Sequence, residues 1–142
     1  MDDDSSHLPQ ATLTGKLFLI FLRVVAVTCL WFGLQYWAML VGYSLGGHGR
    51  FDLLTVPWQI ASASLAVVFP VAALGLWLAG SWGPVIWVLA AGTQIAMYGF
   101  WTDIYGVNRL VIVMHCVVAI VYIIFRAAIW LEGRERPQLN KV

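Results

Sequence analysis

The sequence predicts an all-α integral membrane protein, folded as a four-helix up-down transmembrane bundle. Hydrophobic residues make up 61% of the 142 residues and charged residues 11%, whereas soluble domains average about 25% charged residues. Four separate apolar stretches also approach the length of about 20 residues that crosses a hydrocarbon core of about 30 Å. The formal net charge of +1 gives no basic surface for nucleic acid, so membrane lipids are the expected surroundings.

The four spans are expected at residues 17–41, 56–78, 84–100 and 109–131. The second opens with Pro57, at a position in the first helical turn where a missing N–H has no intrahelical partner to lose. The third also begins near a proline and is the shortest. Because the connections are brief, consecutive helices should be antiparallel neighbours.

Polar segments flank this transmembrane domain of residues 16–132. Residues 1–15 are expected to form a flexible acidic tail, since they open with three aspartates rather than the positive charge of a secretory signal. Residues 133–142 should form a basic tail. Lysines and arginines on the side of the termini are Lys16, Arg134, Arg136 and Lys141, against Arg50 and Arg109 on the opposite side. The positive-inside rule therefore places both termini in the cytoplasm.

A polar stripe marks the fourth span. At 100° per residue, Asn108, His115, Tyr122 and Arg126 project to one side of the helix. Ionisable groups at bilayer depth are unfavourable, and they commonly mark functional sites. Asn108 is expected to cap the helix. Arg126 should reach the headgroups together with Arg23 of the first span, where the two either simply extend to the surface or hold an anionic lipid or ligand.

Each of the other spans carries one glutamine near the depth of His115. Amide side chains hydrogen-bond between membrane helices, and Gln94 shares a helix face with Tyr98. The candidate ligand-binding residues are His115, Gln35, Gln59, Gln94, Tyr98 and Tyr122. The structural alternative is a neutral imidazole bonded to one of the glutamines, with no ligand. No metal site is expected, because Cys116 projects 100° away from His115 and no carboxylate lies in a span.

Three further residues in the spans have structural interpretations. Cys29 and Cys116 are interpreted as small buried hydrophobes rather than a redox pair. Pro70 should bend the second span and free the backbone carbonyl four residues earlier.

No nucleophile with an adjacent base and no acidic pair is found in the spans, so no catalytic residue is assigned and independent catalysis is not expected.

Two segments resemble DoxX-like membrane proteins, a broad superfamily of four-helix bundles. The resemblance is carried by Leu22-Arg23 with Gly33-Leu34-Gln35, and by Leu74-Gly75-Leu76 before the turn at residues 80–84. It covers the first two spans, and it departs from the group's pattern at Tyr36, where a lysine is common. The resemblance implies a divergent protein of the bacterial inner membrane, with relatives linked to quinone or sulfur-compound oxidation. Only Arg23 and Gln35 carry over as matching positions.

The leading functional interpretation is a non-enzymatic assembly or accessory component of a membrane complex, with a membrane-protein partner or a second copy of the chain. A second interpretation is a quinone-linked redox accessory subunit, with His115, Gln94 and Tyr98 bonding the quinone between Trp87 and Trp31. In a third, a transporter or lipid-binding module, Arg23 and Arg126 would hold a phosphate or carboxylate.

Overall fold

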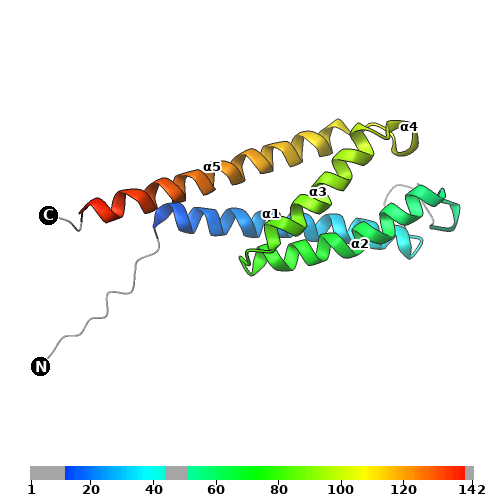
Figure 1. Cartoon of the computed structure of the whole chain (residues 1–142). Coiled ribbons are helices and arrows are strands. Elements are labelled where there is room, and N and C mark those ends of the chain that lie inside the picture. The colour runs from blue at the N-terminus through cyan, green and yellow to red at the C-terminus, as the bar shows by residue number, and fades with distance from the viewer. Residues whose placement is uncertain (1–11, 44–50, 140–142) are drawn as a thin grey trace, which may run out of the picture.

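The computed structural model describes residues 12–43 and 51–139, with side chains as far as Glu135. The predicted N-terminal tail therefore lies outside the described residues up to position 11, including its aspartates at 2–4. Arg50, Lys141 and the side chain of Arg136 also lie outside them. Every regular element in the described ranges is helical (Figure 1). The elements are α1 (Leu13–Leu40), η1 (Phe51–Leu53), α2 (Val56–Trp77), α3 (Gly83–Gly99), α4 (Thr102–Tyr105) and α5 (Arg109–Leu139).

Three of the helices, α1, α2 and α5, are long and apolar enough to cross a membrane. The third predicted span, residues 84–100, corresponds to α3, which has 17 residues. A helix of that length rises about 25 Å, somewhat less than the hydrocarbon core of about 30 Å. The described residues therefore show an all-helical class with three helices long and apolar enough to cross a membrane, and a four-span arrangement depends on α3.

The long helices extend beyond the apolar runs that predict them. The side chain of Thr12 caps α1 by accepting a hydrogen bond from the Gly15 amide at 3.2 Å, so the helix begins at Leu13 rather than at residue 17. At the other end of the chain, α5 continues past the predicted end at residue 131 to Leu139. Helical hydrogen bonding does not require apolar side chains, so hydropathy marks the span rather than the whole helix. The short helices η1 and α4 lie in the connections between the predicted spans.

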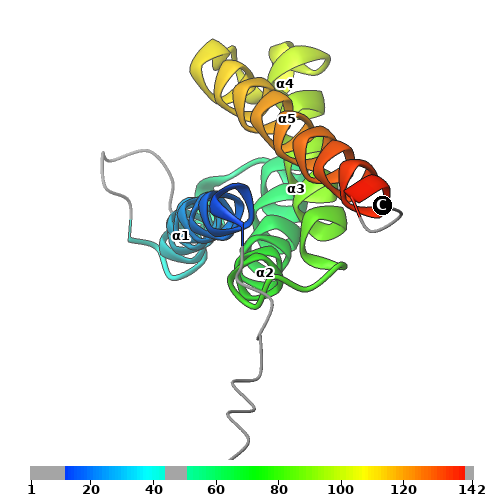
Figure 2. The same ribbon diagram turned by 90° about the vertical axis from the view of Figure 1, so that its left-hand side faces the viewer.

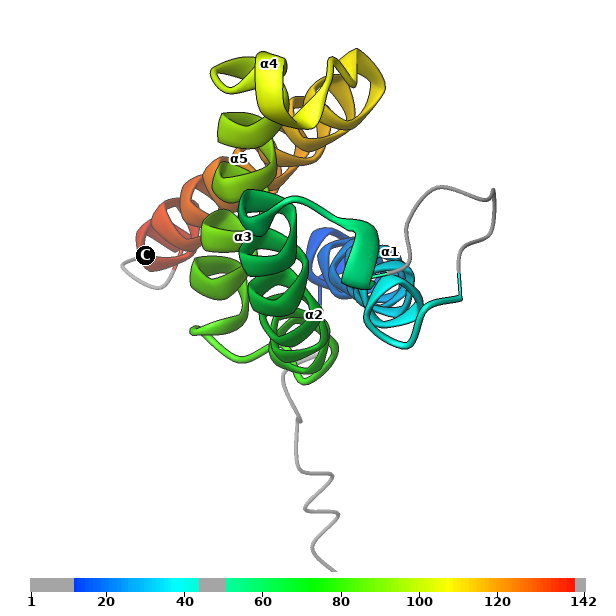
Figure 3. The same ribbon diagram turned by 90° about the vertical axis from the view of Figure 1, so that its right-hand side faces the viewer.

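The helices form two unequal parts. Helices α1 and α2 pack against each other along their lengths, and α3 returns obliquely across α2 towards the start of α5 (Figures 1 and 3). Helix α5 then runs back beside α1, so the first turn of α1 and the last turns of α5 lie at one end of the molecule (Figures 1 and 2). The α1–α2–α3 part contains nearly all of the buried residues, and α5 lies at its edge.

Glycines allow the close contact of α2 with α3. A Cβ atom added to Gly83 would lie 2.4 Å from the carbonyl carbon of Gly75, a distance at which backbone would have to move. Around this contact, Ala72 and Ala90 are completely buried. Small residues at this crossing bring the two backbones together without side chains between them.

Pro70 joins α2 to α1 in two ways. Its ring packs on Gly33 so closely that a Cβ atom there would lie 2.8 Å from the proline Cδ. Proline has no N–H, so the carbonyl of Ala66 loses its helical donor, as the sequence predicts. The indole Nε1 of Trp37 donates to that carbonyl at 2.9 Å. The proline therefore creates both a steric fit and a hydrogen bond between the helices.

We expect Gly33→Ala to destabilise the protein, because the new methyl group would overlap the Pro70 ring. Overpacking of this kind typically costs about 1–3 kcal/mol. Gly92→Ala is the matched control, since a Cβ at Gly92 meets nothing within 4 Å and both changes bring the same gain in helix propensity. Thermal unfolding of the purified variants in detergent measures the difference. Equal midpoints for the two variants would contradict the close contact.

Candidate functional site

A chain of buried polar side chains links α1, α3 and α5. The Nε2 of Gln94 donates to the hydroxyl of Tyr36 at 2.8 Å, and Nε2 of His115 lies 2.6 Å from Oε1 of Gln94. The exposed fractions of these side chains are 4% for Tyr36, 1% for Gln94 and 2% for His115. One glutamine on the oblique helix α3 therefore ties together two helices that flank it.

The hydrogen-bond pattern sets the tautomer of a neutral His115 ring. Because the Gln94 oxygen accepts, Nε2 of His115 carries the hydrogen, and Nδ1 of the neutral ring is then a bare acceptor. Among the described residues, this Nδ1 is a buried atom without a hydrogen-bond partner. Leaving a buried polar atom unpaired typically costs about 1–3 kcal/mol. A donor brought to Nδ1 would recover part of that free energy.

A small cavity lies beside His115, where α5 separates from α1. Its volume is about 120 Å³. The rings of Phe32 and Trp87 each lie with their centroids 6.1 Å from that of His115. The lining residues that matter here are Phe21, Cys29, Phe32, Trp87, His115 and Val118. The surface of this cavity is almost entirely apolar, and its lining also includes Thr28, whose hydroxyl donates to the Val24 carbonyl at 3.1 Å.

The structure extends this polar chain to only one other candidate residue. Tyr98 is half-buried, and its phenol group interacts with that of Tyr36. Tyr122 lies elsewhere, in an aromatic cluster where its ring centroid is 5.8 Å from that of Phe18. Tyr98 therefore continues the chain from Tyr36, and Tyr122 packs α5 against α1.

The other two glutamines do not join the cluster. Gln59 donates from Nε2 to the carbonyl oxygens of Phe51 and Leu54, each at 3.1 Å, so it fastens η1 to the first turn of α2. Gln35 of α1 is half-buried. The α1 side chain that bonds Gln94 is the neighbouring Tyr36, through its hydroxyl, and not the Gln35 amide. The depth of the glutamines suggested one cluster, and two of the three lie outside it.

Arg23 and Arg126 are not brought together. The guanidinium of Arg23 lies over the Trp77 ring of α2, 5.4 Å from its centroid. Arg126 is exposed on α5, which contacts a different side of α1 through Phe18 and Phe21. A single anion-binding site made by both arginines is therefore not formed in this arrangement.

Other predicted features have mixed outcomes. The Asn108 cap is confirmed, because its Oδ1 accepts from the Val111 amide at 3.4 Å. Trp31 is 57% exposed, so it does not flank His115 opposite Trp87.

Both cysteines are free, but only Cys29 is buried and Cys116 is exposed. The interpretation of Cys116 as buried is wrong, because the face of α5 next to His115 points away from the rest of the chain.

Tyr36 is the functional-site residue that the sequence interpretation missed. The sequence motifs mark it only as a departure from the DoxX-like pattern. A helical signal was present, because Tyr36 shares a face with Cys29 and Gly33, and the latter is the residue that contacts Pro70. A tyrosine on the closely packed face of a membrane helix needs a partner for its hydroxyl.

The family model described as "Family of unknown function (DUF6163)" matches residues 16–133. The match spans all the long helices up to the end of the predicted transmembrane domain, and the chain belongs to this family. No curated protein matches the chain, and no solved structure matches it.

We expect Gln94→Leu to lower the free energy of unfolding by roughly 1–4 kcal/mol, because it removes two hydrogen bonds and strands polar atoms of Tyr36 and His115. Gln35→Leu is the matched control, and its effect should stay within about 0.5 kcal/mol. Unfolding in mixed detergent micelles measures both variants. A larger loss for Gln35→Leu than for Gln94→Leu would show that the wrong glutamine had been placed at the centre.

Proposed function

We propose that this member of the family of unknown function is a multi-pass protein of the bacterial inner membrane that acts as a non-enzymatic assembly or accessory component of a larger membrane complex. In this proposal α1, α2, α3 and α5 cross the bilayer as a four-helix up-down bundle, with α3 as the shortest span. The partner is a membrane protein or a second copy of the chain.

The exposed apolar face of α5 is the observation that best supports this proposal. Only 11% of its apolar window is buried, compared with 50% for α2. Its packed face includes Val111, His115 and Tyr122, and the opposite face is exposed along the whole span. The exposed apolar positions on that face are Leu110, Val113, Val117, Ile120, Ile124, Ala127 and Leu131.

These exposed positions alternate spacings of three and four residues without interruption. That repeat is the one with which helices interlock side by side, knobs into holes. Valine and isoleucine hold one χ1 rotamer in a helix, so such a surface loses little entropy when a partner helix packs on it. The pattern supports a helix of another chain as the neighbour of α5.

Two further observations support the proposed topology. Lys16 and Arg134 lie near the end shared by the start of α1 and the end of α5, while Arg109 begins α5 at the opposite end; this distribution favours cytoplasmic termini. The glycines of the DoxX-like motifs, Gly33 and Gly75, both lie at close helix contacts. These contacts hold α1, α2 and α3 of the proposed bundle together, and the distant DoxX-like relationship that we propose for the first two spans rests on the sequence motifs alone.

Photo-crosslinking tests the assembly function. We expect benzoylphenylalanine placed at Ile120 or Ile124 in native membranes to give a protein adduct of one discrete mass, because a partner helix would contact that face. An adduct of twice the chain's mass would identify a second copy. Val67 of α2 is the control, since it is an exposed apolar residue outside this repeat. Lipid adducts alone at all three positions would refute the assembly proposal.

The unpaired Nδ1 of His115 favours a second candidate function, a quinone-linked redox accessory subunit. Since Nδ1 accepts a hydrogen bond, it would hold the hydroxyl of a quinol, which is the reduced form. A cavity of about 150 Å³ admits one benzene ring, and the 120 Å³ here is smaller, so a quinol ring would have to widen the cavity. The contacts would come from His115, Trp87 and Phe32, rather than from Gln94, whose amide is used by Tyr36 and His115.

Quinone content of the purified protein tests this candidate. We expect about one quinol per chain after mild detergent extraction under reducing conditions, and at least a tenfold lower amount in His115→Ala, because loss of one hydrogen bond of about 1.4 kcal/mol changes affinity tenfold. Asn108→Ala should retain the quinone, since it alters only the helix cap. Chromatography of the extracted quinone gives the ratio. A wild-type protein without quinone would count against the candidate.

A further inference from the structure

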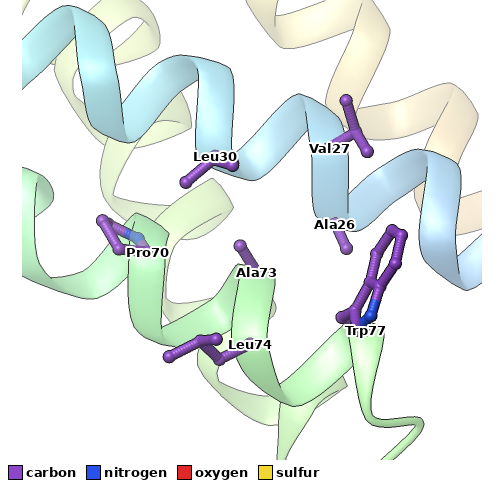
Figure 4. A pocket seen from close by; sticks show the side chains of 7 residues that line it. All are labelled: Ala26, Val27, Leu30, Pro70, Ala73, Leu74 and Trp77. Carbon is purple, nitrogen blue, oxygen red and sulfur yellow. The ribbon is translucent and has the colours of Figure 1, made fainter.

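An apolar groove runs along the outside of the α1–α2 contact. It consists of two adjoining hollows, of about 540 Å³ and 340 Å³, which share Val27 and Trp77. Figure 4 shows the larger one, with side chains of α1 facing those of α2 across it. It is lined by Ala26, Val27, Leu30, Pro70, Ala73, Leu74 and Trp77.

Residue size shapes this groove. Ala26 and Ala73 are buried and form its floor, while Leu30, Leu74 and Trp77 are exposed and form its walls. Small residues between larger ones leave a furrow about one side chain deep. A linear hydrocarbon chain fits such a furrow, and it would restore the dispersion contacts that the floor lacks on its open side.

The groove ends at a positive charge. Arg23 lines the smaller hollow, and its guanidinium lies over the ring of Trp77. Trp77 is the last residue of α2, so this pair marks the level at which α2 leaves the bilayer, where tryptophan and arginine are both common. Within the described residues, no carboxylate lies at salt-bridge distance from Arg23.

The groove is about two-thirds as long as one membrane leaflet is thick. Arg23 and Leu30 are separated by seven residues of α1, which corresponds to about 10 Å of helix rise. Half of a hydrocarbon core of about 30 Å is about 15 Å. The groove therefore runs from headgroup level through most of one leaflet, towards Pro70.

We infer that this groove binds one anionic phospholipid, with an acyl chain along the α1–α2 contact and the headgroup phosphate on Arg23. A guanidinium bonds phosphate oxygens in a bidentate manner, and the contact with the Trp77 ring holds the Arg23 guanidinium beside the groove. The shape selects a hydrocarbon chain and the charge selects an anionic headgroup. The site lies on the α2 side of α1, separate from the His115 cavity and from the exposed face of α5.

Arg126 provides an internal comparison. Phe125 packs against Phe18 and Phe21, with ring centroids 5.7 Å and 5.5 Å apart. Arg126 therefore lies within about one helical turn of the depth of Arg23, on a helix that contributes nothing to the groove. General attraction of anionic lipid to the positive end of the protein would involve both arginines equally, whereas a built groove involves Arg23 alone.

The test is reconstitution in nanodiscs of phosphatidylcholine with a minor fraction of phosphatidylglycerol, followed by native mass spectrometry of the lipids that stay bound. We expect wild type and Arg126→Gln to retain one phosphatidylglycerol, and Arg23→Gln to retain at least tenfold less. Val27→Trp should also lose the lipid, because the indole fills the groove while the charge remains. Val27 is 57% exposed, so this substitution does not enter the core.

Several outcomes would overturn the inference. Equal loss in Arg126→Gln and Arg23→Gln would reduce it to general electrostatic attraction. Retention in Val27→Trp would show that the groove does not hold the chain, and equal retention of phosphatidylcholine would remove the role of the charge. Melting temperatures of all variants in detergent serve as the folding control.

Discussion

The packing of Pro70 on Gly33 is the contact on which the rest of the structure depends. A proline within a membrane helix frees a carbonyl where no water can satisfy it, and here Trp37 of α1 supplies the donor. This fixes both the distance and the rotation of α1 relative to α2. Tyr36, next to Trp37, is thereby directed to Gln94, and Pro70 itself lines the lipid-sized groove. The polar cluster and the groove are thus two consequences of one helix contact.

The attachment of α5 is much weaker, and this explains its other properties. An aromatic cluster of Phe18, Phe21, Tyr122 and Phe125 holds its C-terminal half against α1, while the hydrogen bond from His115 to Gln94 holds its N-terminal half to α3. Thr14 of α1 also donates a hydrogen bond to Glu132 of α5 near their shared end. Beyond the aromatic cluster α5 and α1 diverge (Figure 1), and the cavity lies beside His115. The same geometry leaves the opposite face of α5 uncovered, so a ligand in the cavity and a partner helix on that face would not compete for space.

The sequence predicted the features that depend only on the residues of one helix. The positions of the long helices, the Asn108 cap and the carbonyl freed by Pro70 follow from local rules of hydropathy, capping and proline chemistry. The depth of a residue along its helix follows from its number, and this depth placed Gln94 and His115 at the same level, where the structure joins them by a hydrogen bond. It could not exclude Gln35 and Gln59, because their separation from His115 depends on how the helices are rotated about their axes. That rotation is set by contacts between helices, such as the fit of Pro70 on Gly33, and these are invisible in one sequence.

The same reasoning separates the two arginines. From sequence, Arg23 and Arg126 have similar depth and similar chemistry, and a shared anion site was a reasonable expectation. In the structure α1 presents Phe18 and Phe21 to α5 and Arg23 to Trp77 of α2, so the two guanidinium groups have different surroundings. One has an aromatic face and an apolar groove beside it, and the other is exposed on a helix at the edge of the molecule. A charge at an interface becomes a selective site only where the neighbouring helices also shape a place for the uncharged part of the ligand.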